Sequence, residues 1–93
     1  MSEISCIKVN IRGRVQGVFF RGETQKAARI LKLTGYVKNL GDGSVEALFQ
    51  GEKNSIKKMM KWCSKGSPAS RIDNVLSEPV VFTPDSDSFD ILY

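Results

Sequence analysis

The sequence contains no histidine. This absence excludes the most common general base, the Ser-His and Cys-His catalytic arrangements, and the most common metal ligand. Cysteine is scarce: Cys6 and Cys63 lie far apart along the chain and match no zinc-binding spacing. We therefore expect two reduced thiols, of which Cys63 is a small core residue on a helix, and no disulfide framework, metal site or cofactor.

Long apolar runs are also missing. No stretch approaches the ~18 residues that a membrane span needs. Residues 1–6 show no basic segment followed by an apolar block, so no signal peptide is visible. The 93 residues, of which 41% are hydrophobic and 26% charged, fit one globular domain that spans residues 1–93. We expect a cytoplasmic protein that makes no membrane contact and is a monomer.

The positive charge is concentrated in one segment. Residues 4–22 contain no acidic residue, whereas the rest of the chain holds equal numbers of basic and acidic residues; the basic residues of this segment are Lys8, Arg12, Arg14 and Arg21. A second group of lysines, between residues 53 and 65, is offset by acidic residues near the end of the chain. The net charge of +4 therefore lies in the first strand and the loop after it, where it favours a small anion or a phosphate backbone.

Hydrophobic periodicity and turn residues divide the chain into short elements. The patterns predict helices at residues 22–33 and 54–65, and strands at 4–12, 36–40, 44–50, 71–82 and 88–93. A loop covers residues 13–20, Gly41-Asp42-Gly43 forms a hairpin turn, and a polar turn at 83–87 separates the last two strands.

The two predicted helices each carry one apolar stripe at helical spacing, formed by Thr24, Ala27, Ala28 and Leu31 in the first and by Ile56, Met59, Met60 and Cys63 in the second. Gly35 is expected to form a left-handed cap after the first helix. Asn54 or Ser55 is expected to cap the second helix, which Gly66 and Pro68 end. Trp62 lies beside the second stripe and should be partly exposed.

The order β-α-β-β-α-β, followed by a short terminal strand, predicts an α+β fold of the ferredoxin-like type. This α/β sandwich has a mainly antiparallel sheet with both helices on one face. Enzymes, RNA-binding modules and metal chaperones all use this architecture. The fold therefore does not decide the function, which must be argued from a site.

The loop between the first strand and the first helix could hold a phosphate. Glycines at positions 13 and 17 allow positive φ angles, so that several backbone N–H groups can turn inward together. The first N–H groups of the helix point the same way, and Arg21 could bind two phosphate oxygens. The alternative is an ordinary β-α connection whose arginine pairs with a surface carboxylate. Neither a Walker loop nor a dinucleotide-binding fingerprint is present.

Asn39 is the second candidate residue. It lies near the end of the strand that opens the Gly-Asp-Gly hairpin and shares a face with Val37. Turn chemistry, in which the asparagine bonds its own backbone, explains such a position without a function. The functional alternative is that the side-chain amide holds a water molecule beside a bound anion.

Two segments together resemble the acylphosphatase family. The pattern Ile11-x-Gly13-x-Val15-Gln16-Gly17-Val18-x-Phe20-Arg21 is similar to the first signature of that family. The second signature is matched by Gly35-Tyr36-Val37-Lys38-Asn39 with Asp42-Gly43-Ser44-Val45-Glu46 and Gln50-Gly51, and Phe89-Asp90-Ile91-Leu92-Tyr93 resembles the closing strand. The likeness covers the whole chain, and the first signature has eight fixed positions in eleven residues.

The resemblance implies hydrolysis of acyl phosphates, the mixed anhydrides of a carboxylic acid and phosphate, without a metal. Family substrates include 1,3-bisphosphoglycerate, carbamoyl phosphate, acetyl phosphate and benzoyl phosphate, so the expected partners are such small molecules, inorganic phosphate or another oxyanion. By position, Arg21 binds the phosphate and Asn39 orients the attacking water. The phosphate loop is then formed by Arg14, Val15, Gln16, Gly17, Val18, Phe19 and Phe20.

Three positions depart from the commonest family pattern. Leu40 stands where many members have threonine or serine, so a hydroxyl group near the water or the turn is missing. Tyr36 stands where tryptophan is frequent, and Lys32 replaces a glycine near the end of the first helix. The first departure bears on the rate of the reaction, and the other two lie outside the expected site.

Three other functions are compatible with this element order. An RNA-recognition module would carry base-stacking aromatics on its central strands, but residues 4–12 have none and the third strand has only Phe49. A metal chaperone would need a Cys-x-x-Cys motif. A regulatory or carbamoyl-handling module of the same fold would have little turnover of its own. We expect no nucleic-acid partner.

Overall fold

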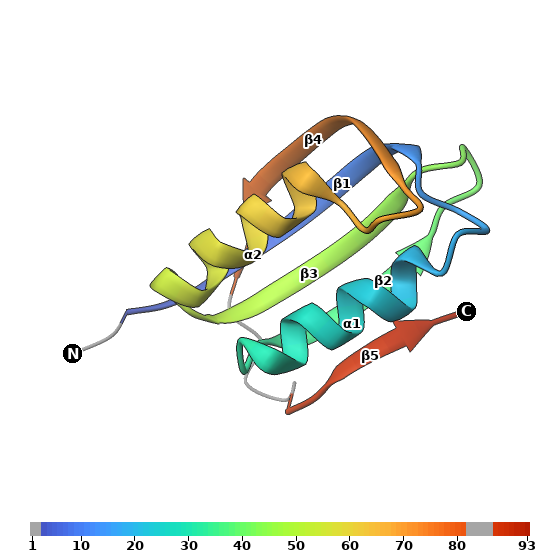
Figure 1. The fold of residues 1–93 in the computed structure, drawn as a ribbon. Coiled ribbons are helices and arrows are strands. Elements are labelled where there is room, and N and C mark those ends of the chain that lie inside the picture. The colour runs from blue at the N-terminus through green and yellow to red at the C-terminus, as the bar shows by residue number, and fades with distance from the viewer. Residues whose placement is uncertain (1–2, 82–86) are drawn as a thin grey trace.

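The computed structural model describes residues 3–81 and 87–93. Two helices and five strands are formed by these residues (Figure 1). In chain order they are β1 (Ile4–Arg14), α1 (Phe20–Ile30), β2 (Thr34–Asn39), β3 (Val45–Glu52), α2 (Lys53–Lys65), β4 (Arg71–Pro79) and β5 (Phe89–Leu92). Neither helix in this part of the chain is long and apolar enough to cross a bilayer.

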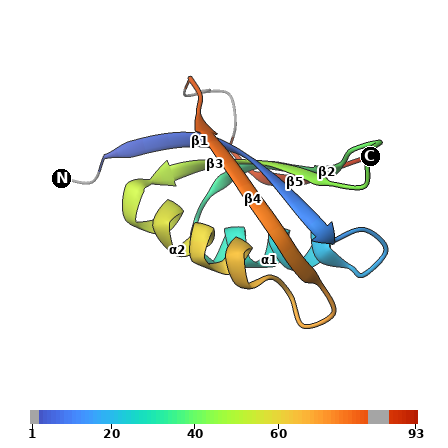
Figure 2. The ribbon, with the colours of Figure 1, turned by 90° about the horizontal axis from the view of Figure 1, so that it is seen from above.

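The strands form one sheet in the order β4-β1-β3-β2-β5. β1 pairs antiparallel with β3 and β4, β2 pairs antiparallel with β3, and β5 pairs parallel to β2. Both helices cover the same face of the sheet, as the view from above shows (Figure 2). The predicted ferredoxin-like α+β architecture is confirmed.

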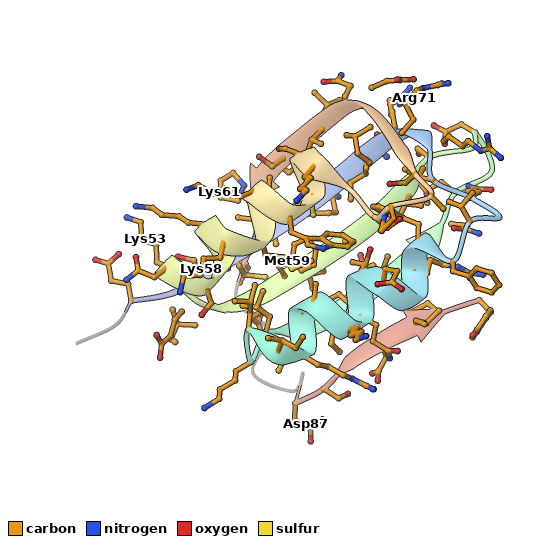
Figure 3. All side chains as sticks on the ribbon, in the orientation of Figure 1. Lys53, Lys58, Met59, Lys61, Arg71 and Asp87 are labelled. Carbon is orange, nitrogen blue, oxygen red and sulfur yellow. The ribbon has the colours of Figure 1, made fainter. Side chains whose placement is uncertain are left out.

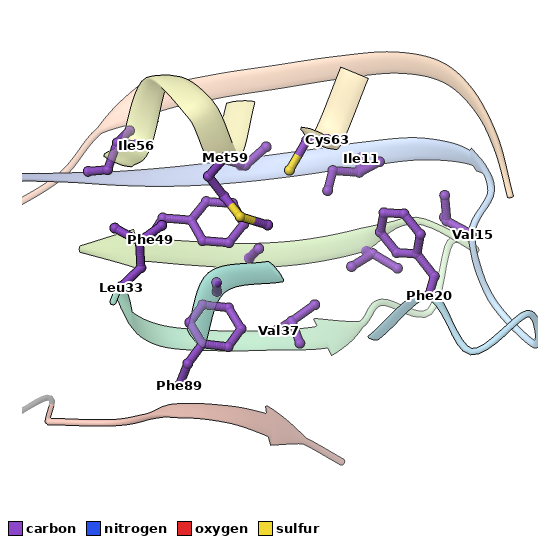
Figure 4. Packing of buried hydrophobic residues seen from close by; sticks show 14 residues of the cluster. Ile11, Val15, Phe20, Leu33, Val37, Phe49, Ile56, Met59, Cys63 and Phe89 are labelled. Carbon is purple, nitrogen blue, oxygen red and sulfur yellow. The ribbon is translucent and has the colours of Figure 1, made fainter. Parts of the chain in front are cut away.

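The core lies between the helices and the covered face of the sheet (Figure 4). Side chains alternate between the two faces of β1 and β3, and those on the covered face enter the core, such as Val9 and Ile11 from β1 and Phe49 from β3. The buried faces of α1 and α2 pack against these side chains from the other side of the core. Figure 3 shows Met59 on the sheet side of α2, while Lys58 and Lys61 point to solvent. Cys63 is buried in this core and Trp62 is partly exposed, as expected.

Both helices begin earlier than their sequence patterns predict. α1 begins at Phe20 because this ring is buried, with only 1% of its surface exposed, and packs against Trp62. α2 begins at Lys53, whose amide donates to the Glu3 carbonyl, and its N-cap residue Glu52 makes no side-chain capping bond. The expectation that Asn54 or Ser55 caps α2 is therefore wrong.

The strand ends also differ from the predicted ones. β1 continues to Arg14, two residues further than expected, and β2 and β3 are each displaced by one or two residues. β4 ends at Pro79, and β5 contains only the residues 89–92. The predicted strand end at Phe82 and most of the turn at 83–87 lie outside the described residues.

The end of α1 is closed by Lys32 rather than by Gly35. The Lys32 amide donates to the Arg29 carbonyl and the Leu33 amide to the Ala28 carbonyl, the bonding pattern of a Schellman motif. Lys32 has the left-handed φ angle of 59° that this motif requires. Gly35 instead lies inside β2, where an added Cβ would come within 1.8 Å of the Leu48 carbonyl oxygen. The predicted cap at Gly35 is wrong, because the helix ends earlier.

Replacing Lys32 with glycine should stabilise the protein. A residue with a side chain costs about 1–2 kcal/mol in the left-handed region, whereas glycine adopts it freely. We expect Lys32→Gly to raise the free energy of unfolding by about 1 kcal/mol. Urea denaturation measures this change, with Lys26→Gly, in the interior of the same helix, as the control that should destabilise. A loss of stability in Lys32→Gly would contradict the strained cap.

Candidate active site

The loop between β1 and α1 has an unusual backbone. Gly17 and Phe19 both have positive φ angles, 74° and 59°, on either side of Val18. Such alternation turns successive amide groups toward one side, the geometry of backbone anion sites. Among the described residues, the loop and cap hydrogen bonds include none in which a backbone amide of residues 16–22 donates to a backbone carbonyl. The bonding along α1 begins with the Glu23 amide, which donates to the Phe19 carbonyl. These donors remain available to a ligand.

The side chains of the predicted phosphate loop divide between the core and the surface. Val15 and Phe20 are buried, and Val18 packs against the same core. Arg14 is the exposed last residue of β1, and Phe19 is exposed at the start of α1. The buried side chains of Val15, Val18 and Phe20 therefore anchor the loop and leave its backbone free to face an anion.

Gln16 ties this loop to the β2–β3 hairpin. Its side-chain Nε2 donates to the carbonyl oxygens of Leu40 and Ser44, each at 2.8 Å. Ser44 is held in turn by Asn10, which donates to its hydroxyl, and by Asp42, whose carboxylate accepts from the Ser44 amide and hydroxyl. The hairpin is thus fixed against the loop. The sequence pattern placed Gln16 in the loop but gave no sign of this side-chain clamp.

The contact between Asp42 and Ser44 in this hairpin depends on the charge of the Asp42 carboxylate. The hydrogen bonds from Ser44 lower the pKa of Asp42 below its usual value of 3.8, and Arg12 adds to the shift. Because this pKa is lower in the folded chain, the contact stabilises the hairpin at neutral pH. Its contribution is lost as the pH falls below about 4.

Removing the Gln16 side chain should weaken the fold. Gln16→Ala removes one hydrogen bond from each of the carbonyl oxygens of Leu40 and Ser44, which lie in a half-buried place and keep only the backbone amides of Gly43 and Leu40 as donors. We expect the free energy of unfolding to fall by about 1–2 kcal/mol. Gln25→Ala is the matched control because Gln25 donates only one such bond, to the Phe89 carbonyl. Urea denaturation compares the two variants, and an equal or smaller loss in Gln16→Ala would contradict the clamp.

Arg21 and Asn39 line one pocket. Arg21 is the second residue of α1, and Asn39 is the exposed last residue of β2. The pocket has a volume of about 330 Å³ and is completed by Val15, Gly17, Phe19, Phe20, Gly22, Ile91 and Tyr93. The structure therefore brings Arg21 and Gly17, from the start of α1 and the loop before it, together with Asn39 from the end of β2.

The end of β5 orients Arg21. One guanidinium nitrogen, Nη1, donates to the Leu92 carbonyl at 3.3 Å, and the guanidinium carbon lies 4.9 Å from the centre of the Tyr93 ring. The sequence patterns did not identify Leu92, the last residue of β5, or the following Tyr93 as part of the site. They reach the pocket because β5 runs parallel to β2, which places Ile91 beside Val37 and Leu92 beside Lys38.

Of the basic residues in the segment 4–22, two are paired with carboxylates, and Arg21, unpaired among the described residues, lies at this pocket. Lys8 pairs with Glu78 at 3.2 Å and Arg12 with Asp42 at 3.5 Å. In residues 3–81 and 87–93, neither Arg14 nor Arg21 has an ion-pair partner. Arg21 has the only charged side chain among the described residues that line the pocket. The alternative in which Arg21 pairs with a surface carboxylate finds no such partner in the described part of the chain.

A second hollow of the same volume lies elsewhere, on the side of the sheet that the helices leave uncovered. It is lined by both acidic and basic residues, Lys8, Arg12, Glu46 and Glu78. Lys8 pairs with Glu78 there, and Glu46 with Lys38 at 3.4 Å. Because these charges balance, this hollow is a poorer place for an anion than the pocket beside Arg21.

The two cysteines are free and buried. Burial raises the pKa of the Cys63 thiol to about 12 and also raises the pKa of Cys6, so both are protonated and unreactive at neutral pH. Within the described residues, no three histidine, cysteine, aspartate or glutamate side chains come together in a way that could hold a metal ion.

Comparison with known proteins agrees with this architecture. The model of the Acylphosphatase family matches residues 7–91. The acylphosphatase of Pelotomaculum thermopropionicum is 39% identical over 85 residues, which cover 91% of this chain and 92% of that protein. A solved acylphosphatase structure from Coxiella burnetii has a TM-score of 0.91 at 42% identity and covers 96% of this chain and 93% of its own. The crystal structure from Bacillus subtilis has the same TM-score at 33% identity, with 98% and 100% covered. This chain belongs to the acylphosphatase family of enzymes.

Proposed function

We propose that the protein hydrolyses acyl phosphates to a carboxylate and inorganic phosphate without a metal ion. In this proposal Arg21 and the backbone amides of residues 14–20 bind the phosphate, and Asn39 orients the attacking water. The observation that carries it is the meeting of one guanidinium group, a set of available amides and one side-chain amide in a single pocket. Membership of the acylphosphatase family supports the same reaction.

This chemistry suits a site with few reactive groups. The leaving group is a carboxylate, which is a weak base and needs no strong acid to protonate it. Phosphoryl transfer spreads negative charge over three equatorial oxygens, and catalysis consists largely of positioning and electrostatic stabilisation. Arg21, the loop amides and the N-terminus of α1 supply positive potential at one place, where it opposes that charge.

The proton of the attacking water needs an acceptor. The chain has no histidine, and the described residues that line the pocket include no carboxylate side chain. The amide of Asn39 is not a base, but its carbonyl oxygen can accept a hydrogen bond from the water. The proton then passes to an oxygen of the substrate's own phosphate group. Asn39 acts in this scheme by holding the water in line with the bond that breaks.

Hydrolysis of benzoyl phosphate by the purified protein tests the proposal. We expect release of benzoate and phosphate far above the uncatalysed rate, and the same rate when a chelator is present. Loss of activity in the chelator would contradict metal independence. A folded protein with no activity would overturn the hydrolase function and would favour a binding or regulatory role for the same loop.

A further inference from the structure

We propose that Phe19 forms the wall of the site that contacts the acyl part of the substrate, and that it favours aromatic or other bulky apolar acyl groups over the acetyl group. The proposal rests on the proposed hydrolysis of acyl phosphates.

The Phe19 ring contributes little to folding. Its exposed fraction is 89%, whereas the neighbouring Phe20 is 1% exposed. The ring stacks on no other aromatic ring in the described part of the chain, where the pairs are Phe20 with Trp62 and Phe49 with Phe89. Phe19 also has a left-handed φ angle of 59°, which is unfavourable for a bulky side chain. A large, exposed and strained aromatic residue therefore needs an explanation other than core packing.

Its place in the pocket supplies that explanation. Phe19 lines the same pocket as Arg21 and Asn39, together with the apolar side chains of Ile91 and Tyr93. Tyr93 is also fully exposed, and its ring covers one side of the Arg21 guanidinium. The pocket thus combines one cationic group with an aromatic and aliphatic rim.

This combination matches a ligand with two unlike ends. The acyl group is attached to phosphorus through the bridging anhydride oxygen. When the other phosphate oxygens bind Arg21 and the loop amides, the acyl group is therefore directed away from the anion site. Apart from Arg21, no described residue of the rim has a charged side chain that could bind an ionic acyl group. An aromatic acyl group gains contact with Phe19 that an acetyl group is too small to make.

The ratio of kcat/KM for benzoyl phosphate to kcat/KM for acetyl phosphate measures this preference. We expect Phe19→Ala to lower the ratio by about 3- to 10-fold, which corresponds to the loss of one aromatic contact. Phe19→Leu should have a ratio between those of Phe19→Ala and the wild type, because leucine keeps part of the apolar contact. Both individual rates can change because residue 19 belongs to the loop, but a defect in the loop backbone affects the two substrates alike and leaves the ratio unaltered.

Ile30→Ala is the matched control, because Ile30 is also a highly exposed apolar residue, at the end of α1, and does not line this pocket. Its ratio should equal that of the wild type. Phe19→Gly adds a second readout: the melting temperature should rise as the strained φ angle is relieved, while the ratio falls as in Phe19→Ala.

These measurements distinguish a failure of the proposed role of Phe19 from a failure of the proposed hydrolase function. If the wild type hydrolyses both substrates and Phe19→Ala keeps the wild-type ratio, the role of Phe19 is wrong and the hydrolase function stands. If the folded wild type hydrolyses neither substrate, the hydrolase function fails, and the role of Phe19 fails with it.

Discussion

Replacing Arg21 with alanine should lower kcat for benzoyl phosphate by about 10²- to 10³-fold and raise KM as well. The size follows from the loss of one preorganised donor to developing charge. KM rises because, among the described residues, Arg21 has the only charged side chain that lines the pocket and pairs with no carboxylate, so its charge is free to act on a bound phosphate. Steady-state kinetics and inhibition by inorganic phosphate measure the two effects separately.

The control for this variant is Arg29→Ala. Arg29 is an exposed residue of the same helix and does not line the pocket. Its removal changes the net charge by the same amount, so it should alter kcat and KM little. Arg21→Lys keeps the charge but loses the planar pair of donors, and should recover only part of the activity. Equal affinity for inorganic phosphate in the wild type and Arg21→Ala would rule out Arg21 as the phosphate-binding residue.

Replacing Asn39 with alanine should instead remove turnover while leaving phosphate binding nearly intact. Asn39 carries no charge, so the affinity for inorganic phosphate should stay within about twofold of the wild-type value. The loss of an oriented water should lower kcat by about 10²- to 10³-fold. Isothermal calorimetry with phosphate and steady-state kinetics on benzoyl phosphate distinguish binding from turnover.

This variant should be as stable as the wild type. The Asn39 side chain is exposed and makes no hydrogen bond to another described side chain or backbone group. Asn74→Ala, an exposed asparagine on β4, is the matched control and should keep full activity. A kcat of Asn39→Ala close to that of the wild type would show that turn chemistry alone accounts for this asparagine.

The sequence predicted the architecture well because its signals are local. Apolar stripes at helical spacing and a glycine-rich hairpin turn mark each element within a few residues. The errors fall at element ends, where tertiary contacts decide. Phe20 extends α1 toward the loop because its ring has a place in the core, and Lys32 takes a left-handed conformation that its residue type does not indicate.

The candidate site was predictable in part for the same reason. Gly17, Arg21 and Asn39 lie in short segments whose residue types suggest anion binding, and the family resemblance assigns them roles. The contributions of Gln16 and Tyr93 could not be predicted from local pattern. Gln16 acts across 24 residues to Leu40, and Tyr93 meets Arg21 only because β5 pairs parallel to β2.

That parallel pairing makes the site depend on a weakly held strand. β5 has four residues, stands at the edge of the sheet and pairs with one neighbour. Its buried Phe89 anchors the start, whereas Leu92 and Tyr93 at the other end are exposed. Local opening at an edge needs less free energy than global unfolding. Detachment of this end releases Arg21 while the core stays folded, so the guanidinium loses its orientation at denaturant concentrations below the global midpoint.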